Sequence, residues 1–280
     1  ELEKVSFHYL SSGAGIRVED ANLADGDDGT DNLTGIETVE FADGELTVSR
    51  DDDGEVQVNT YVSSNQQSPS VTALSDGGYV VTWESYGQVE SWSAEIFGQR
   101  YDAMGGVVGE EFQINTKTYH YQYKPSVTEL NDGGFVVTWE SYDGDGNGYG
   151  ISGQRYDADG TALGGEFVVN TYTGSNQYTP SVTALDDGGF VVAWRDDSGH
   201  DGGSSYDIRV QRFDADGGSV GDEFIVNVDR TVRDQHNPSV TGLDNGEFVI
   251  TWGDQSTNSR SSELGSGFDN NDWAVFAQRF

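Results

Sequence analysis

Apolar and polar side chains alternate in short runs through residues 55–280, which is the two-residue period of a half-buried β-strand. A run such as residues 69–73 (PSVTA) is followed by an acidic turn with two glycines and then by a β-branched run such as residues 79–83 (YVVTW). This order predicts a β-hairpin. A second hairpin follows, with residues 96–101 and 111–116 as its strands. We therefore expect four short strands in each such region.

The pattern recurs four times along the chain. Its clearest landmark is the phrase Pro-Ser-Val-Thr, which begins at the chain's four prolines, Pro69, Pro125, Pro180 and Pro238. The intervals are 56, 55 and 58 residues, and a tryptophan follows each proline by fourteen residues. Such a period indicates stacked or circular repeats. Four antiparallel strands in about 55 residues predict an all-β fold, a four-bladed β-propeller with four-stranded blades.

We expect a separate N-terminal segment, residues 1–54, before the repeat region 55–280. The repeat units are expected at residues 61–116, 117–171, 172–228 and 229–280. The last unit ends after its third strand, whereas residues 55–60 (EVQVNT) have the pattern of a fourth strand. These residues would complete the last blade and close a ring of four without a free edge. An incomplete arc of a larger propeller and an open β array are the alternatives.

The chain carries 49 acidic and 14 basic residues, a formal net charge of −35. Such a charge repels nucleic acid, and its self-repulsion favours bound cations. The absence of cysteine excludes disulfides and thiolate metal sites. No apolar stretch has the length of a membrane-spanning helix. The first residue is not methionine, and we expect the chain to be part of a larger polypeptide.

Aspartate, asparagine and glycine gather in several predicted loops. In one of them Asp143, Asp145 and Asn147 occupy alternate positions, as the first ligands of a calcium-binding loop do. Carboxylate and amide oxygens on a glycine-rich path suit Ca²⁺ better than softer metals. The candidate metal ligands are Asp143, Asp145, Asn147, Asp27, Asp28 and Asp31. The alternative is that these residues only form turns on a halophilic or marine protein surface.

Several segments resemble a known class of proteins. Residues 15–20 (GIRVED) and 28–44 (DGTDNLTGIETVEFADG) resemble a segment that accompanies RTX, or hemolysin-type calcium-binding, repeats in large secreted bacterial proteins. The repeat motif GGFVVTWES, complete at residues 133–141, is similar to repeats of the same class of proteins. The resemblance implies calcium binding and a secreted or cell-surface location. It also implies that the chain is a module of a longer protein.

Differences among the repeat units gather in two sets of loops. One set joins the fourth strand of a unit to the next first strand, at residues 61–68, 117–124, 172–179 and 228–237. The other set joins second to third strands, at residues 86–95, 142–150, 196–207 and 253–274. In an antiparallel four-stranded blade both connections emerge at the same edge. We therefore expect them to form one face of the propeller.

This loop face combines tyrosines and amides with several of the few basic residues. Aromatic rings can stack on sugars, amides can bond hydroxyl groups, and cations can meet carboxylate or sulfate groups. We interpret the face as a glycan-binding surface of a lectin-like or adhesion module. The candidate ligand-binding residues are Gln66, Gln122, Gln177, Gln235, Tyr123, Tyr178 and Arg233. Ordinary solvated loops are the alternative, with the repeated glutamines bonding the backbone where the chain enters each blade.

Residues that are unique to single units suggest a second function. A polysaccharide lyase needs a cation to neutralise the uronate carboxylate and a tyrosine or histidine to move protons. The residues that could supply these groups across the axis of a small propeller are His120, Tyr121, Lys124, Arg195 and His236. No motif fixes their geometry, so the sequence favours a non-catalytic, calcium-stabilised binding module. A structural or assembly protein of the cell surface is a third alternative.

Overall fold

The computed structural model divides the chain into an N-terminal unit, residues 1–57, and a repeat unit, residues 58–280. The described residues are 5–9, 16–20, 30–33, 38–41 and 44–47 in the first unit. The remaining described residues are 56–118, 120–197, 206–228, 234–254 and 274–280. No helix in these ranges is long and apolar enough to span a membrane.

The N-terminal unit is built of short antiparallel strands. Its strands are β1 (Val5–Tyr9), β2 (Ile16–Asp20), β3 (Thr30–Leu33), β4 (Thr38–Phe41) and β5 (Gly44–Thr47). The strands β1, β2 and β3 form one sheet in that order, and β4 pairs with β5. Of the candidate calcium ligands in this unit, Asp31 lies in β3, and Asp27 and Asp28 lie outside the described residues.

The repeat unit contains four antiparallel sheets whose strands follow one another in chain order. Sheet 1 holds β6 (Gln66–Ala73), β7 (Tyr79–Tyr86), β8 (Ala94–Tyr101) and β9 (Val107–Gln113). Sheet 2 holds β10 (Gln122–Glu129), β11 (Phe135–Tyr142), β12 (Tyr149–Tyr156) and β13 (Ala162–Val168). Sheet 3 holds β14 (Gln177–Ala184), β15 (Phe190–Asp196), β16 (Asp207–Phe213) and β17 (Ser219–Ile225). Sheet 4 holds β18 (Gln235–Gly242), the 3-10 turn η1 (Asp244–Gly246), β19 (Phe248–Asp254) and β20 (Ala274–Arg279).

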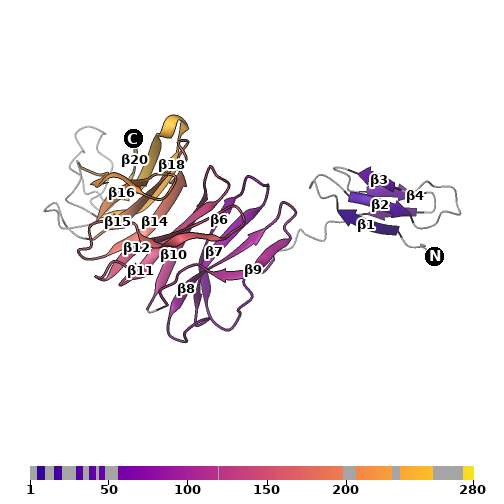
Figure 1. The fold of residues 1–280 in the computed structure, drawn as a ribbon, viewed down its shortest axis with the longest axis horizontal. Helices are drawn as coiled ribbons and strands as arrows, with labels where there is room; N and C mark the ends of the chain where they lie inside the picture. Colours follow the sequence, from indigo (N-terminus) through magenta and orange to yellow (C-terminus); the bar gives the residue numbers. More distant parts are fainter. Residues whose placement is uncertain are drawn as a thin grey trace. The chain divides into compact units, whose positions relative to one another are not determined.

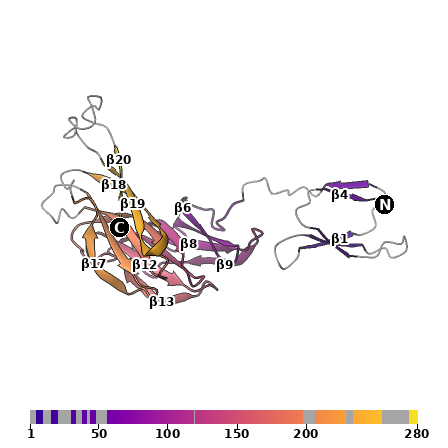
Figure 2. The same cartoon turned by 90° about the horizontal axis from the view of Figure 1, so that it is seen from above.

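The predicted all-β fold of antiparallel propeller blades is therefore confirmed. Figure 1 shows the sheets succeeding one another from purple to yellow, and Figure 2 shows the same order from above. Each of the first three sheets has the four expected strands, and the described residues give sheet 4 three strands.

The acidic Gly-Gly turn closes the first hairpin of sheets 1, 2 and 3. In sheet 1, Gly77 has a φ of +89°, which favours glycine. A Cβ atom on the following Gly78 would lie 2.2 Å from the backbone oxygen of Tyr101. The Asp76 carboxylate accepts a hydrogen bond from the Gly78 amide at 2.8 Å. Both glycines and the preceding aspartate thus have a geometric reason to recur.

The Gln-x-x-Pro phrase forms a β-bulge at the start of each first strand. The pairing register shifts at this point in all four sheets. The residue before each proline has a positive φ, of 53° at Ser68, 49° at Lys124, 52° at Thr179 and 51° at Asn237. Two of these residues donate their backbone amides to glutamates of the preceding sheet, Lys124 to Glu84 at 3.0 Å and Thr179 to Glu140 at 2.7 Å. The bulge therefore links neighbouring sheets.

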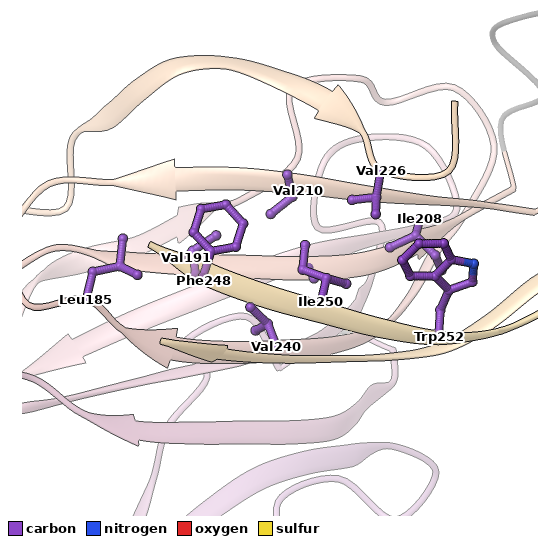
Figure 3. Packing of buried hydrophobic residues seen from close by; sticks show 10 residues of the cluster. Leu185, Val191, Ile208, Val210, Val226, Val240, Phe248, Ile250 and Trp252 are labelled. Carbon is purple, nitrogen blue, oxygen red and sulfur yellow. The ribbon is translucent and has the colours of Figure 1, made fainter. Parts of the chain in front are cut away.

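Consecutive sheets pack face to face, with the first strands β6, β10, β14 and β18 next to one another. Figure 3 shows the junction between sheets 3 and 4. Its labelled residues are Leu185, Val191, Ile208, Val210 and Val226 of sheet 3 and Val240, Phe248, Ile250 and Trp252 of sheet 4. Equivalent side chains fill the other two junctions. The hydrophobic core is therefore divided among the junctions. Burying each such side chain stabilises the fold by roughly 1.5–3 kcal/mol.

A buried asparagine follows the fourth strand of sheets 1, 2 and 3. The side-chain oxygens of Asn115, Asn170 and Asn227 accept the backbone amides of Ile96, Ile151 and Ile208, each at 2.8 Å. Each asparagine also donates its amide to a carboxylate, which belongs to Glu95, Asp145 and Asp207 respectively. In sheet 2 the position of the acid is taken by Gly150, where an added Cβ would lie 2.7 Å from Cγ of Asp145. In sheet 2 a loop aspartate thus accepts the hydrogen bond that a strand acid accepts in sheets 1 and 3.

A second repeated contact joins each sheet to the segment before it. The backbone amide and hydroxyl of Thr116 donate to Glu166 of sheet 2, both at 3.0 Å. The same groups of Thr171 donate to Glu223 of sheet 3, at 2.7 and 2.9 Å. The same groups of Thr60 donate to Glu111 of sheet 1, at 2.7 and 3.0 Å.

The expected closing strand at residues 55–60 is not observed. Residues 56–60 lie in no strand, and within the described part of the chain β20 pairs only with β19. Thr60 nevertheless bonds Glu111 of sheet 1, as the threonines after β9 and β13 bond the next sheet. Closure of four blades into a ring therefore stays a prediction.

We predict that Asn170→Ala lowers the free energy of unfolding by about 2–3 kcal/mol, because the Ile151 amide and the Asp145 carboxylate lose a buried partner. Asn147→Ala, in the exposed part of the same loop, should change it by less than about 0.5 kcal/mol. Urea denaturation measures both values. Equal effects of the two substitutions would contradict the structural role of Asn170.

Candidate ligand-binding face

Both sets of variable loops emerge at one edge of the repeat unit. The first strands begin there, the second strands end there and the third strands begin there. Backbone hydrogen bonds tie the two sets together, from Tyr86 to Asn65, from Tyr142 to Tyr121 and from Gln235 to Tyr206, each at 3.0 Å. The register of the antiparallel sheets thus gathers the loops into one face.

Aromatic rings form a continuous series across this face, which we call the aromatic strip. Its members are Tyr86, Trp92, His120, Tyr121, Tyr123, Tyr142, Tyr149, Tyr178, Tyr206 and His236, together with the guanidinium group of Arg195. The ring of Tyr149 is central, with its centroid 6.2 Å from that of Tyr123 and 5.6 Å from that of Tyr178. The strip therefore crosses from sheet 2 to sheet 3 without a break.

At one end the strip is exposed. Tyr121 stacks on Tyr123 with ring planes 9° apart and centroids 5.5 Å apart. His120 lies between Trp92 and Tyr142, with centroid distances of 6.0 and 5.0 Å. Trp92, His120, Tyr121 and Tyr142 are all exposed. These rings offer flat apolar surfaces to a ligand in solution.

At the other end the strip carries a cation. The guanidinium carbon of Arg195 lies 4.7 Å from the ring centroid of Tyr178 and 4.2 Å from that of Tyr206. Its Nη1 lies 3.0 Å from Nδ1 of His236. Because arginine can only donate, Nδ1 accepts the hydrogen bond and the imidazole is neutral. Arg195 occupies the position that Glu84 and Glu140 hold after the tryptophans of sheets 1 and 2.

Three tyrosines of the strip, Tyr123, Tyr149 and Tyr178, have raised pKa values and remain protonated in neutral and mildly alkaline solution. Burial, reinforced by the charge of Glu140, raises the pKa of Tyr149 to about 12. Burial and the hydrogen bond with Tyr86 raise the pKa of Tyr123, and burial raises the pKa of Tyr178. Their hydroxyl groups can therefore donate hydrogen bonds to a ligand, but they are poor bases.

The side chains of Gln66, Gln122 and Gln177 bond groups within the sheets, and the ligand contact expected of the repeated glutamines stays a prediction. Gln122, Gln177 and Gln235 are fully buried. The side-chain oxygens of Gln122 and Gln66 accept the indole N–H groups of Trp139 and Trp83, at 2.9 and 3.2 Å. In sheet 3, Gln177 instead donates to Asp196 at 3.0 Å and accepts from Asn170 at 3.1 Å.

The five residues considered for a lyase lie in separate places. Arg195 and His236 are in contact at one end of the strip, and His120 and Tyr121 lie at the other. Within the described contacts, the series from His120 to Arg195 runs through Tyr142, Tyr149 and Tyr178.

The remaining candidate residues lie in different surroundings. Lys124 is paired with Glu140, at 3.1 Å from Nζ to the carboxylate. Tyr123 and Tyr178 belong to the strip. Arg233 lies outside the described residues.

The proposed calcium loop is held together by its own hydrogen bonds. Asp145 accepts the backbone amide of Asn147 at 3.1 Å and the side-chain amide of Asn170 at 2.7 Å. Asp143 has a φ of 58° and bonds Gly148 through its backbone. Over the described residues, no group of three or more histidine, aspartate or glutamate side chains has the arrangement of a metal site. Calcium binding by this loop stays a prediction.

The sequence interpretation did not single out Tyr86, Tyr142, Tyr149 or Tyr206. The first two follow the repeated tryptophan of their sheets by three residues, and Tyr149 begins a third strand. An aromatic residue at a strand end on the loop edge is the feature that identifies them. Their mutual contacts depend on how the sheets pack.

No protein-family model and no curated protein sequence matches the chain. The solved GH93 α-L-arabinofuranosidase of Fusarium graminearum with arabinobiose is similar, with a TM-score of 0.54 and 16% identity, over 76% of this chain and 62% of that one. The same enzyme with an iminosugar inhibitor gives 0.54 and 15%, over 79% and 64%. A Hadza microbial sialidase gives 0.51 and 11%, over 76% and 44%. The chain thus spans less than two thirds of these proteins, and the likeness shows the fold alone.

We predict that acid destabilises the protein partly through His236. Burial and the adjacent Arg195 lower its pKa from 6.5, despite the opposing charge of Asp234. A lowered pKa in the folded state means that stability is present above pH 6.5 and is lost as the pH falls through the folded value. The melting temperature should therefore fall less between neutral and mildly acidic pH in His236→Asn than in the wild type. His120→Asn keeps the pair with Arg195 intact, and an equal change in both variants would contradict the prediction.

Proposed function

We propose that the repeat unit is a non-catalytic glycan-binding module. The observation that supports it best is the aromatic strip, which offers exposed rings at Trp92, Tyr121 and Tyr142 on one continuous face. Sugar rings carry apolar C–H faces that stack on such side chains, while their hydroxyl groups accept and donate hydrogen bonds. The protonated hydroxyl groups of Tyr123, Tyr149 and Tyr178 supply donors beside the exposed rings.

The length of the strip favours a polymer over a single sugar. The rings extend over sheets 1, 2 and 3 and reach His236 of sheet 4 through Arg195. Several shallow contacts along one chain add up to a useful affinity where each contact alone is weak. The similar solved structures include a complex with arabinobiose, which supports a carbohydrate as the ligand class.

Arg195 favours a glycan with some negative charge. It is the cation of the strip among the described residues, and it replaces the glutamates found at the same position in sheets 1 and 2. A guanidinium group held between two rings can bond a carboxylate or sulfate with little loss of conformational freedom. The net charge of −35 opposes polyanions in general, so an anionic group would have to be sparse along the glycan.

A polysaccharide lyase is the alternative that Arg195 and His236 favour, since they pair a cation with a neutral imidazole. Against it, the raised pKa values of Tyr123 and Tyr149 keep these hydroxyl groups protonated at neutral pH, so they cannot take a proton from the sugar. His120 and Tyr121 also lie apart from the Arg195–His236 pair. These features favour binding over cleavage.

The wider setting is also a proposal. The resemblance to RTX-associated segments supports a secreted or cell-surface module of a larger bacterial protein, stabilised by calcium. The excess of 49 acidic over 14 basic residues supports the stabilisation by calcium, because bound cations would relieve the repulsion between the acidic groups.

We predict that the protein binds one or more polysaccharides of a panel containing arabinan, alginate and insoluble cellulose. Trp92→Ala and Tyr121→Ala should each weaken binding about five- to tenfold, because one stacked ring contributes about 1 kcal/mol. Affinity electrophoresis and co-sedimentation measure binding. The matched control is Phe224→Ala. Phe224 lies on β17, outside the aromatic strip, and its exposure of 38% is close to the 36% of Tyr121.

Three results would decide between the functions. Binding that survives both strip substitutions, or that Phe224→Ala weakens equally, would contradict the proposed site. New unsaturated uronate ends, detected by ultraviolet absorbance and lost in His236→Asn, would establish the lyase. No binding and no cleavage on the panel would favour an assembly role.

We predict that calcium raises the melting temperature and that magnesium does so less, because Ca²⁺ accepts more oxygen ligands in irregular loops. A site filled to a hundredfold above its Kd adds roughly 2.7 kcal/mol of stability. Asp143→Asn and Asp28→Asn each remove one charge, and asparagine tolerates the left-handed backbone of residue 143. The variant that loses the calcium response locates the ion. A melting temperature unchanged by calcium and by chelator would contradict the proposal.

A further inference from the structure

The three junctions between sheets share one set of contacts. On the later sheet, Val127, Val182 and Val240 are 7%, 7% and 8% exposed. On the earlier sheet, the third strand contributes Ile96, Ile151 and Ile208, which are 0% exposed. Every junction therefore joins a valine face to an isoleucine face.

A repeated hydrogen bond fixes how the two faces meet. The backbone amide of the valine donates to a serine hydroxyl of the earlier sheet, from Val127 to Ser70 at 3.2 Å and from Val182 to Ser126 at 3.2 Å. The third junction repeats it from Val240 to Ser181 at 3.1 Å. Each sheet thus has a donor side and an acceptor side.

The first and last sheets each leave one of these faces uncovered. Val71 on the valine face of sheet 1 is 64% exposed, although its three counterparts are buried. Val275 on the isoleucine face of sheet 4 is 82% exposed, although its counterparts are completely buried. Ser239 of sheet 4 is the counterpart of the accepting serines and is exposed. Over the described residues the two end faces are complementary halves of one junction.

The segment before sheet 1 repeats one more contact of the existing junctions. Thr60 bonds Glu111 as Thr116 bonds Glu166, so Thr60 lies where the residue after a preceding outer strand would lie. Val56 in this segment is exposed and lies in no strand. Sheet 4 is the sheet that shows three strands in the described residues.

We infer that the two end faces bind each other between two copies of this chain, head to tail. The valine face of sheet 1 in one copy packs on the isoleucine face of sheet 4 in the other. Residues 56–60 of the first copy then lie beside β20 of the second and supply its outer edge. A second copy is the occupant because it carries the complementary face, with its serine acceptor, in the right order.

Closure within a single chain would need the same faces to meet. It would require rotation at junctions whose side chains are already packed to near-complete burial, and such interiors do not deform continuously. A second copy covers both faces without any change at the three existing junctions. Because the contact is heterologous, two copies close into a ring or further copies extend the series.

The test uses the full 280-residue chain in sedimentation velocity over a wide range of concentration, at an ionic strength of about 0.15 M, which screens the net charge. The wild type should associate. Val71→Asp and Val275→Asp should each weaken association at least tenfold, since each places a charge in the new junction. Val220→Asp is the control, because Val220 on β17 is 44% exposed and belongs to sheet 3, which carries neither end face.

An equimolar mixture gives the sharpest result. Val71→Asp keeps an intact sheet 4 face and Val275→Asp keeps an intact sheet 1 face, so the mixture should form a dimer and nothing larger. Circular dichroism checks that each variant is folded. If Val71→Asp or Val275→Asp fails to fold, Val56→Asp is used in its place, since residue 56 lies outside every strand, and it should also weaken association. A wild type that is monomeric at every concentration overturns the proposal. So does an assembly that the end-face substitutions leave unchanged, or a mixture that stays monomeric.

Discussion

Packing of one sheet face on the next is the interaction on which the repeat unit depends. The chain has no cysteine, and its described core is divided among junctions in which valine, isoleucine and aromatic side chains of neighbouring sheets meet. A single sheet of four strands has two faces and cannot bury either alone. Each sheet is therefore stable only because its neighbours are present, as in other repeat proteins.

The aromatic strip is a product of the same packing. Tyr149 starts a strand of sheet 2 and Tyr178 lies at the start of sheet 3, and their rings meet only because the two sheets are stacked in register. The hydrogen bond from the backbone amide of Thr179, the residue after Tyr178, to Glu140 holds the edges of these sheets together. A binding face assembled in this way needs no large or flexible loop, since strand ends carry its central residues.

The sequence was sufficient to predict the repeat, the antiparallel hairpins and the loop face, because period, turn glycines and strand alternation are local properties. It was not sufficient for the glutamines, because their repeated position is equally compatible with a ligand contact and with a bond to the buried indole of Trp139. Nor could it separate His120 from His236, which lie at opposite ends of the strip. Such outcomes depend on which side chains of different sheets approach each other.

The exchange of a strand acid for a loop acid in sheet 2 limits how freely the units can be interchanged. Asn170 needs one carboxylate, and Asp145 provides it from the loop while Gly150 leaves the room for it. A form of sheet 2 that took the strand acid of the other sheets at position 150 would hold that acid and the loop aspartate together. Two negative charges would then compete for one amide in a buried site, at a substantial cost in stability. The units are alike in outline, yet each is a matched set of parts that can be exchanged only as a whole.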